Sequence, residues 1–178
     1  MVVALCTVEV MAYSANDLGQ RRDGYVKLNG DPVWQSSWAG PFPTVRGVVT
    51  FLLDPYSCSV KESRRFDTLH SEGNAVLLRD YLNRQKAGAL LVGVTADEPR
   101  HGLTPALATL NGLGVDVSDV AYRGAFAFIA QKGFASKTVL RRALTEADAL
   151  AFQPRFNTVI RGILFFYRVY RVDKCCSL

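Results

Sequence analysis

Residues 45–54 read VRGVVTFLLD, an almost unbroken apolar segment with a charged residue near each end. Apolar residues on both faces of a strand are typical of a sheet that is covered on both sides. Asp54-Pro55 ends the strand, because this dipeptide favours a turn. A return strand over about 59–66 then predicts a β-meander.

Further elements follow from hydrophobic periodicity and from turn residues on either side of this meander. Asn29-Gly30 is a strong hairpin signal between two short strands. Thr104-Pro105 is predicted to cap and begin a short helix that stops near Gly112, and Ser136 to cap another that Pro154 ends. The other predicted strands are 7–13, 25–28, 33–35, 88–95, 125–130 and 158–172, and a further helix is predicted at 74–84. In the helix after Ser136, one face carries Leu140, Ala143, Leu144, Ala147 and Leu150.

The composition indicates a folded protein with one core. The 178 residues are 49% hydrophobic and 21% charged, which is typical of a globular domain. We expect one compact α+β domain over residues 1–153, followed by a closing strand and a basic tail over 154–178. No apolar run approaches the roughly 20 residues that a membrane-spanning helix needs.

The net charge of +5 is concentrated near the C-terminus. Residues 153–178 contain five arginines and lysines against one aspartate, so most of the excess lies there. A nucleic-acid-binding protein is expected to spread basic residues over a folded face. The charge pattern therefore argues against nucleic acid as a partner.

The four cysteines leave their pairing open. Cys6, Cys58, Cys175 and Cys176 allow two disulfides, although the adjacent pair is not expected to bridge to itself. Two buried free thiols and a loose tail are an equally good interpretation. No cysteine or histidine cluster has the spacing of zinc ligands, so we expect neither a metal site nor a cofactor.

Ordinary catalytic motifs are missing from the sequence. The two histidines, His70 and His101, lie in predicted loops, and no nucleophile elbow or phosphate-binding loop occurs. Asp97-Glu98 offers paired carboxylates, but adjacent residues of a strand point to opposite faces. We therefore expect no catalytic residue, and a carboxylate-dependent hydrolase or transferase stays an alternative.

Strand ends supply a better candidate for binding. Asp97 ends an apolar strand, while Arg46 and Arg123 each precede one. Guanidinium groups and a carboxylate beside an aromatic ring, either Phe126 or Tyr122, can bind a sugar. The alternative is an arginine–aspartate ion pair that only tethers loops. Secondary candidates for ligand binding are Glu98, Phe126 and Lys132.

Four fragments in this order resemble the interleukin-like EMT inducer/PANDER domain family, over about residues 5–135. The fragments are 45–54, RRFDT at 64–68, VTADE at 94–98 and RGAFAFIAQKG at 123–133. The resemblance implies a two-sheet β-sandwich with flanking helices and a non-enzymatic binding module. Some members of the family bind a glycan terminus, and the matching positions here are Arg46, Asp97 and Arg123.

The chain departs from the family pattern in ways that bear on the ligand. The acidic and tryptophan residues usual after the arginine are missing from Arg123-Gly124-Ala125-Phe126, and Cys58 lies in a hairpin that normally has none. Partners implied by the resemblance are a glycan or glycoprotein. The alternative is a protein receptor, bound by a cytokine-like or structural interaction domain.

The resemblance implies an extracellular location or the lumen of the secretory pathway. We interpret the apolar N-terminus as a first strand, so that a signal peptide would lie upstream in a longer precursor. The alternative is a cytosolic protein with a lipid anchor, because Cys175-Cys176-Ser177-Leu178 formally fits a prenylation box behind basic residues.

Overall fold

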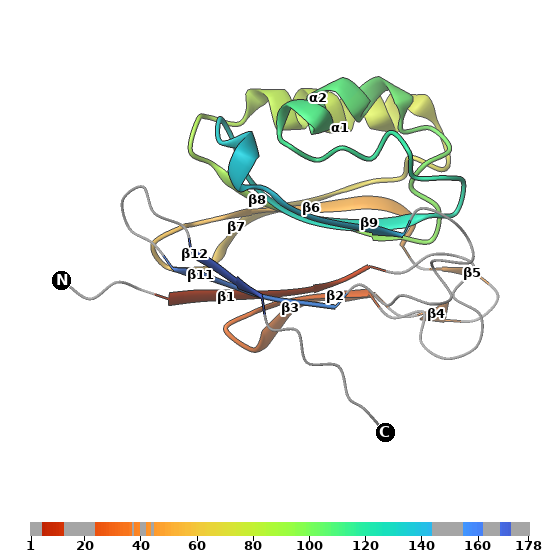
Figure 1. Cartoon of the computed structure of the whole chain (residues 1–178). Helices are drawn as coiled ribbons and strands as arrows, with labels where there is room; N and C mark the ends of the chain where they lie inside the picture. Colours follow the sequence, from red (N-terminus) through yellow and green to blue (C-terminus); the bar gives the residue numbers. More distant parts are fainter. Residues whose placement is uncertain are drawn as a thin grey trace.

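The computed structural model describes residues 5–12, 24–36, 38–39, 42–43, 45–143, 155–161 and 168–171. Two antiparallel five-stranded sheets are stacked, and both α-helices cover the outer face of one of them (Figure 1). The layers are therefore helix, sheet and sheet, which confirms the predicted α+β sandwich with flanking helices.

The first sheet has the strand order β12-β11-β1-β2-β3. Asn29-Gly30 forms the predicted hairpin turn between β2 and β3, with both residues at positive φ. A two-stranded ribbon of β4 and β5 follows β3 in the chain. The bounds are β1 Leu5–Met11, β2 Gly24–Leu28, β3 Asp31–Ser36, β4 Trp38–Ala39, β5 Phe42–Pro43, β11 Arg155–Arg161 and β12 Arg168–Arg171.

The second sheet has the strand order β10-β9-β8-β6-β7, so the meander strand β6 lies between β8 and β7. Two helices, α1 and α2, follow β7 and β8, and short 3-10 turns, η1 and η2, precede α2 and β10. The bounds are β6 Gly47–Leu53, β7 Val60–Phe66, α1 Glu72–Arg84, β8 Leu90–Ala96, η1 Thr104–Ala106, α2 Leu107–Gly112, β9 Ala125–Gln131, η2 Ala135–Lys137 and β10 Val139–Ala143.

Two apolar clusters hold the layers together, one on each face of the second sheet. On β6, Val49, Phe51 and Leu53 pack towards β1 and β2 of the first sheet. Val48 packs on the opposite face, in the cluster that contains the buried residues of α1 and α2. Burial on both faces explains why the central strands have no polar alternation.

A disulfide between Cys6 and Cys58 joins the two sheets. Cys6 lies in β1, and Cys58 lies in the turn between β6 and β7, where it has a left-handed φ of 56°. Both cysteines belong to the apolar cluster between the sheets. Cys6 and Cys58 are therefore a disulfide pair and not two buried free thiols. Cys175 and Cys176 lie outside the described residues, as does the whole predicted prenylation box.

Most predicted elements are confirmed, and three predictions are wrong. The first part of the helix expected after Ser136 is instead η2 followed by β10, because residues 139–143 pair with the edge of β9. The rest of that predicted helix, residues 144–154, lies outside the described residues. Thr104 is not an N-cap, since η1 begins at Thr104 itself and Leu103 precedes it without a side-chain cap. The single closing strand is two paired strands, β11 and β12.

The division at residue 153 stays a prediction. Residues 155–161 form β11, which lies beside β1 in the first sheet and pairs with it along its whole length.

Within the described part of the chain, no helix is long and apolar enough to cross a membrane.

Replacing Gly93 with alanine is expected to lower the free energy of unfolding by about 1 to 2 kcal/mol, because extra atoms overpack a buried site. A Cβ at Gly93 would overlap the ring of Phe128, its partner across β8 and β9. Gly112→Ala is the matched control, since nothing lies within 4 Å of its added Cβ. Urea unfolding of both variants measures the difference, and equal midpoints would contradict the expectation.

Candidate functional site

The three residues predicted to bind a ligand lie at the same end of the second sheet. Gly47 at the start of β6 pairs with Ala96 at the end of β8, and β9 runs antiparallel to β8 beside it. Arg46, Asp97 and Arg123 therefore flank the ends of three neighbouring strands. We call this end of the sheet, with residues 46, 67–71, 97–102 and 120–124, the rim.

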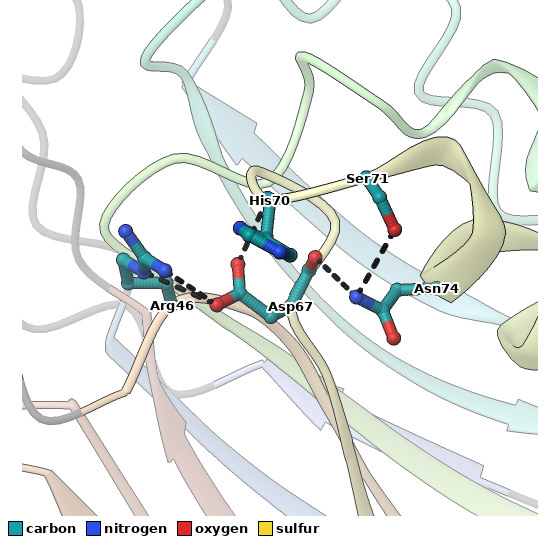
Figure 2. Close-up of polar contacts among 5 residues, drawn as sticks. All are labelled: Arg46, Asp67, His70, Ser71 and Asn74. Atoms are coloured by element: carbon teal, nitrogen blue, oxygen red, sulfur yellow. Dashed lines mark hydrogen bonds and ion pairs between the residues drawn. The ribbon is translucent and has the colours of Figure 1, made fainter.

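Arg46 forms an ion pair with Asp67, in the turn after β7 (Figure 2). The Nη2 and Nε atoms of Arg46 donate to Oδ2 of Asp67 at 2.8 and 3.2 Å. The other carboxylate oxygen of Asp67 accepts the backbone N–H of His70 at 3.1 Å. The side-chain amide of Asn74 donates to the carbonyl of Asp67. Asp67 thus shapes the turn before α1 and fixes the direction of the arginine.

Backbone contacts hold this turn against the sheet. Gly47 has a φ of 86°, and a Cβ there would overlap the carbonyl oxygen of Phe66 and lie 2.6 Å from the backbone nitrogen of Thr68. The buried hydroxyl of Thr68 donates to the carbonyl of Pro99 at 2.7 Å, and Gly102 N–H donates to the carbonyl of Thr68 at 3.0 Å. The turn after β7 and the loop after β8 are therefore one packed unit.

Glu98 connects the loop after β8 to the loop before β9. Its side chain is 2% exposed, and its Oε1 accepts the backbone N–H groups of Arg100 at 2.6 Å and His101 at 3.0 Å. Its Oε2 accepts the backbone N–H of Arg123. Burial raises the pKa of Glu98, the three N–H donors oppose that rise, and the charge of Asp97 adds to it. Both oxygens of Glu98 are thus used within the protein.

Asp97 and Arg123 both have a left-handed backbone, with φ of 61° at each. Such a conformation is uncommon for residues other than glycine and is concentrated at functional sites. Asp97 is 6% exposed, so it presents much less surface than a fully exposed strand-end residue would. The rim therefore offers two partly exposed arginines and one mostly buried aspartate.

Tyr122 supplies the exposed aromatic face of the rim. Its side chain is 56% exposed, and the guanidinium carbon of Arg123 lies 5.3 Å from its ring centroid. The ring of His101 approaches edge-on, with centroids 6.5 Å apart. Arginine and tyrosine at this separation stabilise each other through a cation–π interaction. Position 122 thus provides an exposed aromatic ring beside Arg123.

The secondary candidates do not join this group as ligand-binding side chains. Phe126 is fully buried among the residues beneath the helices and is stacked on Phe128, so it cannot contact a ligand. Lys132 lies beyond the opposite end of β9, where its Nζ donates to the carbonyl of Leu82 in α1 at 3.0 Å. Glu98 organises the loops, as described above. Core packing positions Phe126, and the contact with the end of α1 positions Lys132.

Two rim residues, Asp67 and His101, have roles that no motif of the sequence indicates. Asp67 lies in the RRFDT fragment, whose aspartate directly follows a strand and is therefore placed at the same end as Arg46. His101 lies in a predicted loop, and its role at the rim comes from the edge-on contact with Tyr122. Among the described residues, no group of three or more histidine, cysteine, aspartate and glutamate side chains could hold a metal ion.

Comparison with known protein families adds one match. The family model described as interleukin-like EMT inducer matches residues 46–134, which is half of the chain. The match begins at Arg46 and contains every rim residue. No curated protein sequence matches the chain.

Proposed function

The chain belongs to the interleukin-like EMT inducer family, and from this premise we propose that it is a non-enzymatic module that binds a glycan at the rim. Membership of the family supports a cytokine-like, non-enzymatic module in general terms. The observation that carries the finer proposal is that Arg46, Asp97 and Arg123 flank three neighbouring strand ends.

Each part of the rim has a role in this proposal. Guanidinium groups donate pairs of parallel hydrogen bonds, which suits the adjacent hydroxyls or the carboxylate of a sugar. Asp67 holds the guanidinium of Arg46 in place, and the ring of Tyr122 offers a flat face for the apolar side of a sugar ring. The remaining exposure of Asp97 allows it to accept a hydrogen bond from a sugar hydroxyl.

Catalysis by the adjacent carboxylates is less well supported. A general acid or base needs an oxygen within hydrogen-bond reach of its substrate. Both oxygens of Glu98 accept backbone N–H groups instead. We therefore propose that the rim binds a ligand and does not catalyse a reaction.

The proposed partner is a glycan or glycoprotein outside the cell or in the secretory pathway. The disulfide between Cys6 and Cys58 supports this location, because structural disulfides persist mainly in oxidising compartments.

A glycan array probed with the wild-type protein and three variants tests the proposal. Arg46→Lys keeps the charge opposite Asp67 but removes the planar fork, Asp97→Asn keeps a residue that tolerates the left-handed backbone, and Tyr122→Ala removes the ring. For the glycan bound best, Arg46→Lys and Asp97→Asn are each expected to weaken binding by about tenfold, because hydrogen bonds to charged groups contribute about 1.5–3 kcal/mol. Tyr122→Ala is expected to weaken it because it removes the flat face on which the sugar ring packs.

The control is Arg79→Lys, which changes an arginine paired with Asp80 on α1. Binding of this variant should match that of the wild type. The proposal would be contradicted if no glycan bound the protein, or if the three rim variants bound the glycan as well as the control does.

A further inference from the structure

A second surface lies between β7 and α1, and it shares none of the three proposed glycan-binding residues. The hollow has a volume of about 420 Å³ and is lined by residues 62–66 of β7 and by four residues of α1. Those four are Asn74, Leu77, Tyr81 and Arg84. Their spacing of three, four and three residues places them on one face of the helix. We call this hollow the edge groove.

One wall of the edge groove is the outer strand of the second sheet. Within the described ranges, β7 pairs only with β6, so its other side has no strand partner. An outer strand presents alternate backbone N–H and C=O groups that can pair with an added chain. Extended peptides bind other domains in this way, with main-chain hydrogen bonds for affinity and side-chain pockets for specificity.

The helix wall offers apolar surface to alternate side chains of such a peptide. Leu77 is 58% exposed, although it is a large apolar residue in the middle of a stable helix. Tyr81 is buried, and its ring lies 5.6 Å from the guanidinium carbon of Arg64 on β7. A chain added to β7 would cover Leu77 and pack beside this arginine.

The charge of the edge groove decides between an acidic peptide and a second copy of this chain. Arg64, Arg65 and Arg84 line it against one acidic residue, Glu62, which already accepts from Arg64 Nε at 2.6 Å. Pairing two β7 strands would bring arginines on one copy close to arginines on the other, which is unfavourable. An acidic strand instead meets opposite charges along its length.

We propose that the edge groove binds an extended, acidic peptide segment of a partner protein, which adds as a strand to β7. The peptide has acidic residues facing Arg64 and Arg84 and an apolar residue over Leu77. This interaction is separate from the glycan proposal, because it uses neither Arg46 nor Arg123.

An array of nine-residue peptides tests the proposal directly. Because alternate residues of a strand face the same way, one set places acidic residues and leucine, in varied order, at alternate positions, with valine or threonine between them. A second set replaces the acidic residues with lysine, and a third keeps the acidic residues and leucine but has proline at the positions between them. The first set is expected to bind the wild-type protein, and the second and third are not. Proline removes the N–H groups that strand addition requires.

Variants then locate the bound peptide. Arg64→Glu and Arg84→Glu are each expected to weaken binding of the best acidic peptide by at least about fivefold, since charge complementarity is reversed. Arg79→Glu makes the same charge change on α1 outside the groove and should stay within about twofold of the wild type. Leu77→Gln should weaken binding with little change in the melting temperature, because this side chain is exposed and glutamine forms helices about as well as leucine.

Amide hydrogen exchange supplies the structural readout. Binding of the best acidic peptide should slow exchange in residues 60–66 and leave β10, at the opposite edge of the sheet, unchanged. Four outcomes would overturn the proposal. They are that no acidic peptide binds, that the acidic and basic sets bind equally, that the proline set binds as tightly as the first set, or that the protected amides lie outside β7. Concentration-dependent dimerisation that Arg64→Glu abolishes would assign the edge to a second copy and would also overturn it.

Discussion

Removing the disulfide with the double change Cys6→Ala and Cys58→Ala is expected to lower the free energy of unfolding by about 4 kcal/mol. The bond closes a loop with a sequence separation of 52 residues. Constraining a loop of this length reduces the entropy of the unfolded chain by about that amount. The pair also fixes β1 of the first sheet to the turn that follows β6 in the second. Guanidinium chloride unfolding of the oxidised wild type and the double variant measures the loss.

Reduction of the wild-type protein provides the control for this prediction. A reductant opens the bond but keeps both sulfur atoms in the apolar cluster, so it separates the effect of the cross-link from that of packing. The reduced wild type should unfold at nearly the same denaturant concentration as the double variant. An oxidised wild type no more stable than either of them would show that the cross-link does not stabilise the fold.

Glu98→Ala is expected to lower the free energy of unfolding by about 3 kcal/mol and to abolish glycan binding at the rim. The change leaves three backbone N–H donors, those of Arg100, His101 and Arg123, without their acceptor. An orphaned buried donor costs about 1–3 kcal/mol, and the more exposed of the three are expected to recover water. The loops after β8 and before β9 then lose the links through Glu98 and keep the hydrogen bond from Arg100 Nε to the carbonyl of Val120. Urea unfolding gives the stability, and glycan titration gives the binding.

Glu72→Ala is the matched control, because it deletes an exposed glutamate from the first turn of α1. Its effect should stay below about 1 kcal/mol, which is the scale of a charge near a helix terminus. Hydrogen exchange adds a local readout: the amides of 100, 101 and 123 should exchange faster in Glu98→Ala. If stability is lost while these amides keep their protection, Glu98 does not connect the loops as described.

The sheets could be predicted from the sequence because their strands are buried on both faces and end at turn residues. β6, β8 and β9 all fall within two residues of their predicted ends. The prediction failed at residues 139–143, where the apolar spacing fits a helix. There the free edge of β9 decides the conformation, and a partner strand distant in sequence leaves no mark on local periodicity.

The rim could be predicted only in part. Strand ends placed Arg46, Asp97 and Arg123 at one end of the sheet, since antiparallel neighbours bring a start and an end together. The pairing of Arg46 with Asp67 depends on how the turn before α1 folds back, which no spacing specifies. The role of Glu98 depends on backbone N–H groups, and these are the same in every sequence. The pairing of Cys6 with Cys58 depends on how the two sheets are stacked.

The frame beneath the rim consists of buried groups: the backbone around Gly47, the hydroxyl of Thr68 and the carboxylate of Glu98. Positions 70, 101 and 122 stand on this frame and are exposed. Substitutions at exposed positions away from such buried features usually change stability by no more than about 0.5 kcal/mol. New recognition specificities can therefore evolve, or be selected in a library, by varying these positions while the architecture tolerates the change.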